Sequence, residues 1–268
     1  MKKAIQILFV LFLFAACTPQ TYYQLSETSS QSLLANRDNI FYDNEDIEIT
    51  YNFWSDRGNG SFVLYNKTDK DIYVDLKRSH LIINDYSFTY YQNRTYSTPK
   101  VSLFSSFTDD EIQERRNIQF PGVTPKNLTK TAAEVVIFNE ERIICIPPNS
   151  FQMIYGFNLQ TEFYRDCNLL RFPKPKEIVS TEFSSENSPL IYRNRITYGF
   201  TENMQEVKQI ENEFWVSKIT NLPENEFLGS EYQKYCNDSS TYRVITYPMQ
   251  KNSSFYFKYK LEPGSLNH

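Results

Sequence analysis

The sequence predicts a mainly β protein: an antiparallel β-sandwich with a long insertion and a minor amount of helix. The composition is rich in aromatic residues, with 20 Tyr and 21 Phe against 7 Gly and 4 Met, and such residues suit a pleated, half-buried surface. From Asp46 onward, short alternating segments follow one another, each bounded by turn-forming residues. This spacing is typical of an all-β sandwich or barrel.

The first strand of this body is expected over residues 46–54, where Ile47, Ile49 and Tyr51 face one way and polar residues the other. Asn84-Asp85 separates two later apolar segments and predicts a tight turn between paired strands. Further strands are expected at 61–66, 72–76, 80–84 and 86–91.

Residues 93–133 lack the regular succession of short strands and predict a long insertion. Within it, Thr108 and Glu111 form a capping-box pattern that predicts a short helix. The segment 206–222 is ambiguous, because part of it has helical spacing and part fits a strand. Strands are expected to resume at 133–138, 141–146, 151–159, 195–200, 241–249 and 253–263. In the third of these, alternation places Phe151, Met153, Tyr155 and Phe157 on one face.

Residues 1–16 predict a signal peptide, because two lysines precede an apolar run of 13 residues, whereas a bilayer-spanning helix needs about 20. The run ends in Phe14-Ala15-Ala16-Cys17, which resembles the lipobox of bacterial lipoproteins. The resemblance implies cleavage before Cys17, lipidation of that residue and anchoring in the outer membrane, with the periplasmic face favoured over the cell surface. Ordinary secretion, with Cys17 incidental, and an uncleaved membrane anchor are the alternatives.

Residues 17–45 are rich in Ser, Thr, Gln and Asn and predict a polar tether that follows the lipid anchor. Residues 46–268 are then expected to form the sandwich domain, with its insertion near 93–133. Whether residues 176–268 form a separate domain is left open by the sequence, because no clear linker precedes them.

Two segments carry a resemblance to known modules: SFVLYNKTDKDIYVDLKRSHLIIN (61–84) and RIICIPPNSFQMIYGF (142–157). They resemble the immunoglobulin-like β-sandwich of exported bacterial proteins, in which a polar Asn-x-Thr turn ends one strand and a Pro-rich turn precedes a later one. The whole chain is similar to uncharacterised lipoproteins of Bacteroides-type bacteria. The resemblance covers about residues 46–157 and implies a fold more than an activity.

Three cysteines are left once Cys17 is set aside. Cys145 lies in an apolar run and is expected to be buried. Cys167 and Cys236 lie in polar, loop-like contexts and are the candidates for one disulfide, which an exported location allows.

The chain carries no motif for a catalytic centre or a cofactor. His80 and His268 are its two histidines, and no cysteine–histidine cluster or G-x-S-x-G elbow accompanies them. We therefore predict no catalytic residue, no metal site and no cofactor. The absence of phosphate-binding glycine motifs argues against a nucleotide, and the formal charge of −4 argues against nucleic acid.

The most suggestive segment for binding is YSFTYYQNRTY (86–96), in which aromatic rings adjoin amides and an arginine. Tyr90, Tyr91 and Tyr96 are the predicted ligand-binding residues, since Tyr is common in binding surfaces; the alternative is that these rings pack in the core. The predicted function is a non-enzymatic cell-envelope lipoprotein that binds a protein or glycan partner. The alternative is a hydrolase of glycan or peptidoglycan that uses paired carboxylates.

Overall fold

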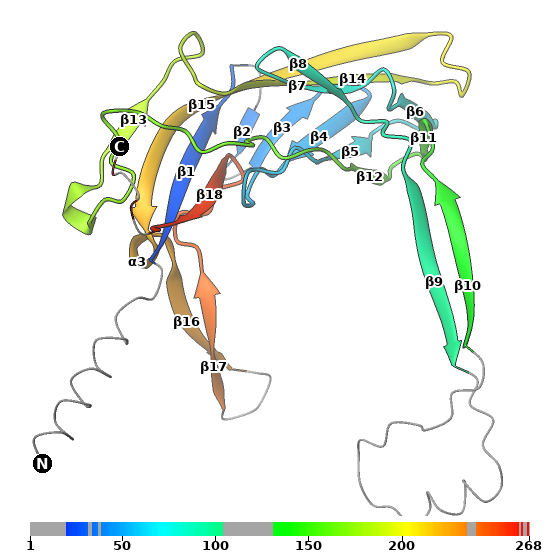
Figure 1. Cartoon of the computed structure of the whole chain (residues 1–268). Coiled ribbons are helices and arrows are strands. Elements are labelled where there is room, and N and C mark those ends of the chain that lie inside the picture. Colours follow the sequence, from blue (N-terminus) through cyan, green and yellow to red (C-terminus); the bar gives the residue numbers. More distant parts are fainter. Residues whose placement is uncertain are drawn as a thin grey trace, which may run out of the picture. The chain divides into compact units, whose positions relative to one another are not determined.

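The computed structural model describes residues 20–31, 34–36, 39–103, 131–234, 240–262, 264 and 267. The predicted signal peptide, Cys17, Cys236, His268 and the helix at Thr108 lie outside these residues. The described chain is mainly β, and its strand ladders are antiparallel, which confirms the predicted fold class (Figure 1). It divides into two compact units, one formed by Tyr91–Arg142 and the other by the remainder.

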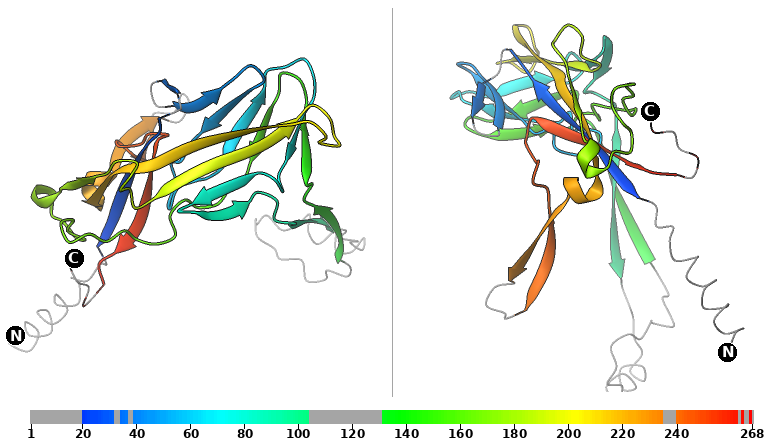
Figure 2. Two further views of the ribbon diagram at one scale, coloured as in Figure 1. Left: turned by 90° about the horizontal axis from the view of Figure 1, so that it is seen from above. Right: turned by 90° about the vertical axis from the view of Figure 1, so that its left-hand side faces the viewer.

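The larger unit holds two principal sheets. Among the described residues, the first has nine strands: β1 (Thr21–Ser29), β6 (Ile72–Asp75), β7 (His80–Ile83), β8 (Tyr86–Thr89), β11 (Ile143–Ile146), β13 (Ser180–Glu182), β14 (Ile191–Gly199), β15 (Val207–Pro223) and β18 (Ser254–Lys260). Their order is β11-β6-β14-β15-β1-β18; β7 also pairs with β14 and with β8, and β13 pairs with β15. The long β15 runs through the middle of this sheet (Figure 2).

Five strands form the second sheet within the described part of the chain: β2 (Leu34–Asn36), β3 (Asn39–Asp43), β4 (Ile47–Tyr51), β5 (Phe62–Asn66) and β12 (Phe151–Ile154), in the order β12-β5-β4-β3-β2. The predicted alternation is confirmed in β4 and β5, where every second side chain is buried. A separate hairpin pairs β16 (Gly229–Lys234) with β17 (Thr241–Thr246). Helical structure is limited to η2 (Pro175–Glu177) and α3 (Glu224–Phe227) in the described residues.

The two sheets pack face to face around buried aromatic rings. The ring of Tyr51 in β4 lies edge-on to Phe214 in β15, with 4.9 Å between centroids. The Tyr51 hydroxyl accepts hydrogen bonds from the amide groups of Asn194 (2.9 Å) and Asn212 (2.6 Å) on the opposite sheet. Burial raises the pKa of Tyr51, and its neutral hydroxyl gives both buried amide nitrogens a hydrogen-bond acceptor. The contacts between facing sheets confirm a β-sandwich.

The tether predicted for residues 17–45 is wrong where the structure describes it. Thr21–Ser29 forms β1, which lies between β15 and β18 in the first sheet (Figure 1), and Asn39–Asp43 forms β3 of the second. The polar residues that suggested a tether are partly internal, because Gln24 is fully buried and Thr28 donates a hydrogen bond to the Ser253 carbonyl. A buried polar side chain that finds partners is tolerated in a strand.

Two local predictions are decided by the structure. The turn at Asn84-Asp85 is confirmed, because both residues have positive φ, 44° and 69°, as a two-residue hairpin turn of this kind requires. The ambiguous segment 206–222 is a strand, because Val207–Pro223 pairs with β14 along one part and with β1 along another. These pairings outweigh the helical spacing of its apolar residues.

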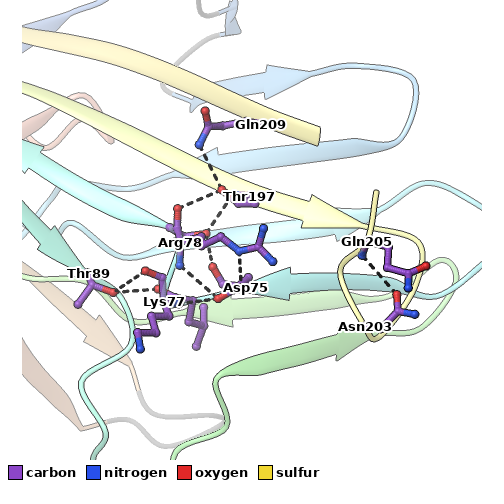
Figure 3. Close-up of polar contacts among 10 residues, drawn as sticks. Asp75, Lys77, Arg78, Thr89, Thr197, Asn203, Gln205 and Gln209 are labelled. Carbon is purple, nitrogen blue, oxygen red and sulfur yellow. Dashed lines mark hydrogen bonds and ion pairs between the residues drawn. The ribbon is translucent and has the colours of Figure 1, made fainter. Parts of the chain in front are cut away.

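A buried carboxylate organises the turn that follows β6 (Figure 3). Asp75 is fully buried, and its Oδ1 accepts hydrogen bonds from the backbone N–H groups of Lys77 (3.0 Å) and Arg78 (3.2 Å). Its Oδ2 accepts a hydrogen bond from the Arg78 guanidinium at 2.8 Å, and Thr89 donates to the carbonyl of Leu76. Asp75 is thus engaged in holding the turn between β6 and β7.

The smaller unit is a hairpin of β9 (Thr95–Leu103) and β10 (Thr131–Asn139). The two ends of the insertion predicted at 93–133 belong to these two strands. The segment between the strands lies outside the described residues. At its base, Glu140 accepts hydrogen bonds from the backbone N–H of Gln92 (2.7 Å) and from the Arg94 guanidinium (3.0 Å). This carboxylate therefore closes the base of the hairpin.

The base of this hairpin is expected to loosen in acid. Burial raises the pKa of Glu140, but the hydrogen bonds and charge of Arg94, with the N–H of Gln92, outweigh burial and hold that pKa below its ordinary value. A lowered folded-state pKa gives a stabilisation that is complete above the ordinary value of about 4.3 and is lost as pH falls through the folded value. Amide hydrogen exchange at residues 92–95 should therefore accelerate in that window. In the variant Glu140→Gln, these amides should exchange faster at neutral pH, and their exchange should depend little on pH. If acid accelerates exchange equally in the variant and in the unchanged protein, Glu140 is not the group responsible.

Candidate functional site

A groove of about 430 Å³ lies on the larger unit, within the range of small-ligand sites. We call it the aromatic groove. It is formed by the β7–β8 hairpin, the segment 159–165, residues 189–190 and the buried strands β1 and β15. Its described lining comprises Ser26, Ile83, Asn84, Tyr86, Phe88, Leu159, Gln160, Thr161, Glu162, Phe163, Tyr164, Arg165, Pro189, Leu190, Val216 and Ile219.

One wall of the groove carries exposed aromatic rings from β8. Tyr86 and Phe88 are two residues apart, so their side chains lie on the same face of this edge strand. Tyr86 is 75% exposed, and the Phe88 ring is also exposed, with its centroid 5.5 Å from that of Phe157. Large rings left in water next to a hollow are typical of binding surfaces.

The floor of the groove is apolar except for one hydroxyl. Leu159, Val216 and Ile219 are all buried there. Ser26 of β1 is fully buried between them, and its Oγ has no hydrogen-bond partner within the described part of the chain. Because a buried hydroxyl without a partner is costly, Ser26 offers a donor and an acceptor to a group that enters the groove.

The rim of the groove is polar and carries both signs of charge. Glu162 and Arg165 are exposed, and neither forms an ion pair with another described residue. Asn84 is already engaged, since its amide donates to the Pro189 carbonyl and accepts from the Ile191 N–H. The rim can thus hydrogen-bond a ligand while the rings of β8 contact its apolar faces.

Gln24 of β1 holds the segment that forms the second wall. Its amide nitrogen donates to the Tyr164 carbonyl and to Asn221 Oδ1, both at 2.9 Å. Its amide oxygen accepts from the Tyr164 N–H (3.0 Å) and from Gln160 Nε2 (3.2 Å). All the hydrogen-bonding positions of this fully buried amide are used, so Gln24 fixes residues 160–164 against the sheet.

The structure separates the three predicted ligand-binding tyrosines. Tyr90 is 1% exposed and donates a hydrogen bond to Asn194 Oδ1 at 2.8 Å, so the prediction that it contacts a partner is wrong: it is a core residue. Tyr91 belongs to the smaller unit, where its hydroxyl donates to Asn93 Oδ1 at 3.0 Å. The Tyr96 side chain lies outside what the structure describes.

The segment predicted for binding contains Tyr86 and Phe88, which the sequence prediction did not name. Both lie in the stretch 86–96, and their alternation after the Asn84-Asp85 turn was a usable signal of a shared face. Tyr90 continues the same alternation in the sequence. However, β8 ends at Thr89, and the Tyr90 side chain is buried in the core. Periodicity alone therefore does not separate the exposed rings from the buried one.

The cysteine predictions are corrected in part. Cys145, expected to be buried, is exposed on β11, which is an edge strand. Cys167 is also exposed and free, and its predicted disulfide with Cys236 stays a prediction. Cys236 itself lies outside the described residues.

Carboxylates line two of the hollows in the described part of the chain. In the aromatic groove, Glu162 is the one carboxylic acid among the described lining residues. A second hollow adjoins Glu45 and Asp46, where Asp46 forms an ion pair with Lys208 and accepts a hydrogen bond from the Tyr198 hydroxyl at 2.9 Å. Hydrolysis of a glycosidic bond by the usual mechanism requires two carboxyl groups flanking it.

The described residues contain no cluster of three or more His, Cys, Asp and Glu side chains placed to hold a metal ion. Within the same part of the chain, no helix has the length and apolar character needed to cross a bilayer. His80 lies half-buried on β7, opposite Thr89.

Comparisons with protein-family models, with curated proteins and with solved structures found no match to this chain.

Proposed function

We propose that this chain is a cell-envelope lipoprotein that binds a glycan in the aromatic groove and catalyses no reaction. It is exported by its N-terminal segment and anchored in the outer membrane through lipid on Cys17, with the periplasmic face favoured. The observation that carries the binding proposal is the exposed pair Tyr86 and Phe88 beside a polar rim and a buried, unpartnered Ser26 hydroxyl.

The chemistry of the groove supports a sugar ligand. A pyranose ring has apolar faces that pack on aromatic rings and an equatorial belt of hydroxyl groups that need hydrogen-bond partners. Tyr86 and Phe88 supply the rings, while Glu162 and Arg165 supply an acceptor and donors at the rim. A protein partner that inserts a polar side chain is the competing ligand, and the experiment below separates the two.

Removal of the Tyr86 ring is expected to weaken glycan binding at least about tenfold, because exposed aromatic residues at binding sites commonly contribute 1–2 kcal/mol or more. The measurement is calorimetric titration of the full chain and of Tyr86→Ala with the glycan that binds best on an array of envelope polysaccharide and peptidoglycan fragments. The matched control is Tyr232→Ala, because Tyr232 is equally exposed, at 75%, and lies on β16 away from the groove lining.

Three outcomes would contradict the glycan assignment. One is that no array glycan binds, and a second is that Tyr232→Ala weakens binding as much as Tyr86→Ala. The third is that an envelope protein is retained by the wild-type chain and lost with Tyr86→Ala while no glycan binds. Turnover of the bound glycan would instead contradict the non-enzymatic part of the proposal.

Anchoring is tested separately at Cys17. The variant Cys17→Ala is expected to move from the membrane fraction to the soluble fraction, because its lipid attachment site is gone and stable anchoring needs more than one acyl chain. The measurement is fractionation of cells followed by detection of the protein, with Cys167→Ala as the matched cysteine control. A Cys17→Ala protein that stays fully in the membrane fraction would show that another feature holds it there.

A further inference from the structure

Strand β12 lies at the edge of the second sheet, next to β5 (Figure 1). Phe151 is 67% exposed, Met153 48% and Tyr155, directly after the strand, 62%. The Phe151 ring stacks on Tyr65 of β5 with 4.4 Å between centroids. The edge thus carries a row of large apolar side chains on its outer face.

The backbone of β12 directs hydrogen-bonding groups outward along the same edge. The Asn66 N–H donates to the Ser150 carbonyl at 3.0 Å, which makes 150 and 66 a hydrogen-bonded pair. Because such pairs alternate along an antiparallel ladder, Gln152 and Ile154 direct their backbone groups toward β5. The N–H and C=O groups of Phe151 and Met153 therefore point away from the sheet. The Met153 carbonyl accordingly accepts a hydrogen bond from the Gln152 side chain at 3.2 Å.

This edge lacks the features by which proteins usually prevent strand pairing. Residues 150–156 read Ser-Phe-Gln-Met-Ile-Tyr-Gly and contain no charged residue and no proline. Lysine, proline or a bulge is the common protection of an exposed edge. An uncovered, apolar edge of this kind is suited to accept another strand.

We propose that β12 pairs with β12 of a second copy of this chain, in an antiparallel arrangement centred on Met153, so that the two second sheets become continuous. In this register Met153 faces Met153 of the partner subunit, and Phe151 faces the partner's Tyr155. Both pairs are formed by residues whose backbone groups point outward, as the new ladder requires. Directly opposed residues of antiparallel strands share a face, so the aromatic pairs lie together on the outer side.

A second copy fits this edge better than an unrelated peptide because the segment is complementary to itself. When two copies of the segment run antiparallel about Met153, Phe151 lies opposite the partner's Tyr155, and the small Ser150 lies opposite the partner's Gly156. The absence of charge means that two copies meet without repulsion between like charges along the strand. The inference does not depend on the aromatic groove, which lies on other elements.

The test is sedimentation of the full-length chain in detergent over a range of concentrations, with a reductant present so that exposed Cys145 and Cys167 form no disulfides. We expect a reversible dimer. Met153→Lys would place two like charges opposite each other and should weaken association at least about tenfold. Val207→Lys is the matched control, because it places the same charge on another exposed apolar strand residue and should leave the dimer unchanged.

A second variant separates loss of pairing from loss of folding. Met153→Pro removes a backbone N–H that points away from β5, so the sheet should persist while the partner loses a hydrogen bond. Weakened dimerisation with an unchanged circular dichroism spectrum supports the pairing. A chain that is monomeric throughout the range overturns it, as does a dimer unaffected by both variants. Capture of a different peptide by a monomeric chain likewise overturns it.

Discussion

A chain shortened to begin at Asp46 is expected to be unfolded, although its deleted segment is rich in the polar residues of a tether. The deletion removes β2 and β3 of the second sheet together with β1, which is paired on one side with β15 and on the other with β18. Without β1, both neighbours lose a full ladder of backbone hydrogen bonds, and β18 loses its strand partner in the described part of the sheet.

The lost burial is as large as the stability of a typical domain. Tyr22, Tyr23 and Leu25 are all buried, and the Tyr23 ring stacks on Phe227 with 4.1 Å between centroids. Each large buried apolar side chain contributes roughly 1.5–3 kcal/mol, against a total stability of about 5–15 kcal/mol for most domains. Burial also raises the pKa of Tyr23 to about 12, with a smaller effect from Glu224.

Circular dichroism and one-dimensional proton NMR measure this outcome directly. A chain that begins at Gln20 is the control and is expected to keep the dispersed spectrum of a folded protein, because it retains β1. A chain beginning at Asp46 that unfolds cooperatively near the midpoint of the control would restore the tether interpretation of residues 17–45.

Gln24→Leu is expected to cost about 2–4 kcal/mol of unfolding free energy, because a buried amide with four hydrogen bonds is replaced by a side chain of similar size that makes none. Gln160, Tyr164 and Asn221 would each be left with a polar group that lacks this partner. Since Gln24 holds residues 160–164, the wall of the aromatic groove should also become mobile, and glycan affinity should fall at least about tenfold.

Urea denaturation reports the stability change, and the calorimetric titration used for Tyr86→Ala reports the binding change. Gln209→Leu is the matched control, since the exposed Gln209 makes a single hydrogen bond, of 3.3 Å, to Thr197 (Figure 3). Equal effects of the two substitutions would show that Gln24 has no special role. A destabilised Gln24→Leu with full glycan affinity would show that the groove wall does not depend on it.

Local pattern was sufficient for much of the sandwich. In β4 and β5, apolar side chains at every second position do face the core, because a strand with one buried face must alternate. The β7–β8 turn was equally readable, since Asn84 and Asp85 are residues that tolerate positive φ. These features depend on contacts between residues that are close in sequence.

The errors arise where burial depends on distant partners. Gln24 is internal because Asn221, Gln160 and Tyr164 satisfy its amide, and none of these is near it in the sequence. Conversely, the apolar residues Phe151 and Met153 are exposed on the outer face of β12, which is an edge strand of its sheet. A polar strand can thus be central and an apolar one can lie at an edge.

In the candidate site, too, some features follow from local sequence and others depend on distant contacts. The stretch 86–96, rich in aromatic residues beside amides, predicts a binding segment from composition alone, and the apolar run ending at Cys17 predicts export and an anchor. Which rings reach solvent follows from the place where β8 ends: Tyr86 and Phe88 stay outside, while Tyr90 enters the core and bonds to Asn194. The groove itself exists because residues 159–165 return to β1, a contact between segments more than 130 residues apart. Such long-range contacts set the depth, the walls and the polar groups of a site, and no periodicity within either segment encodes them.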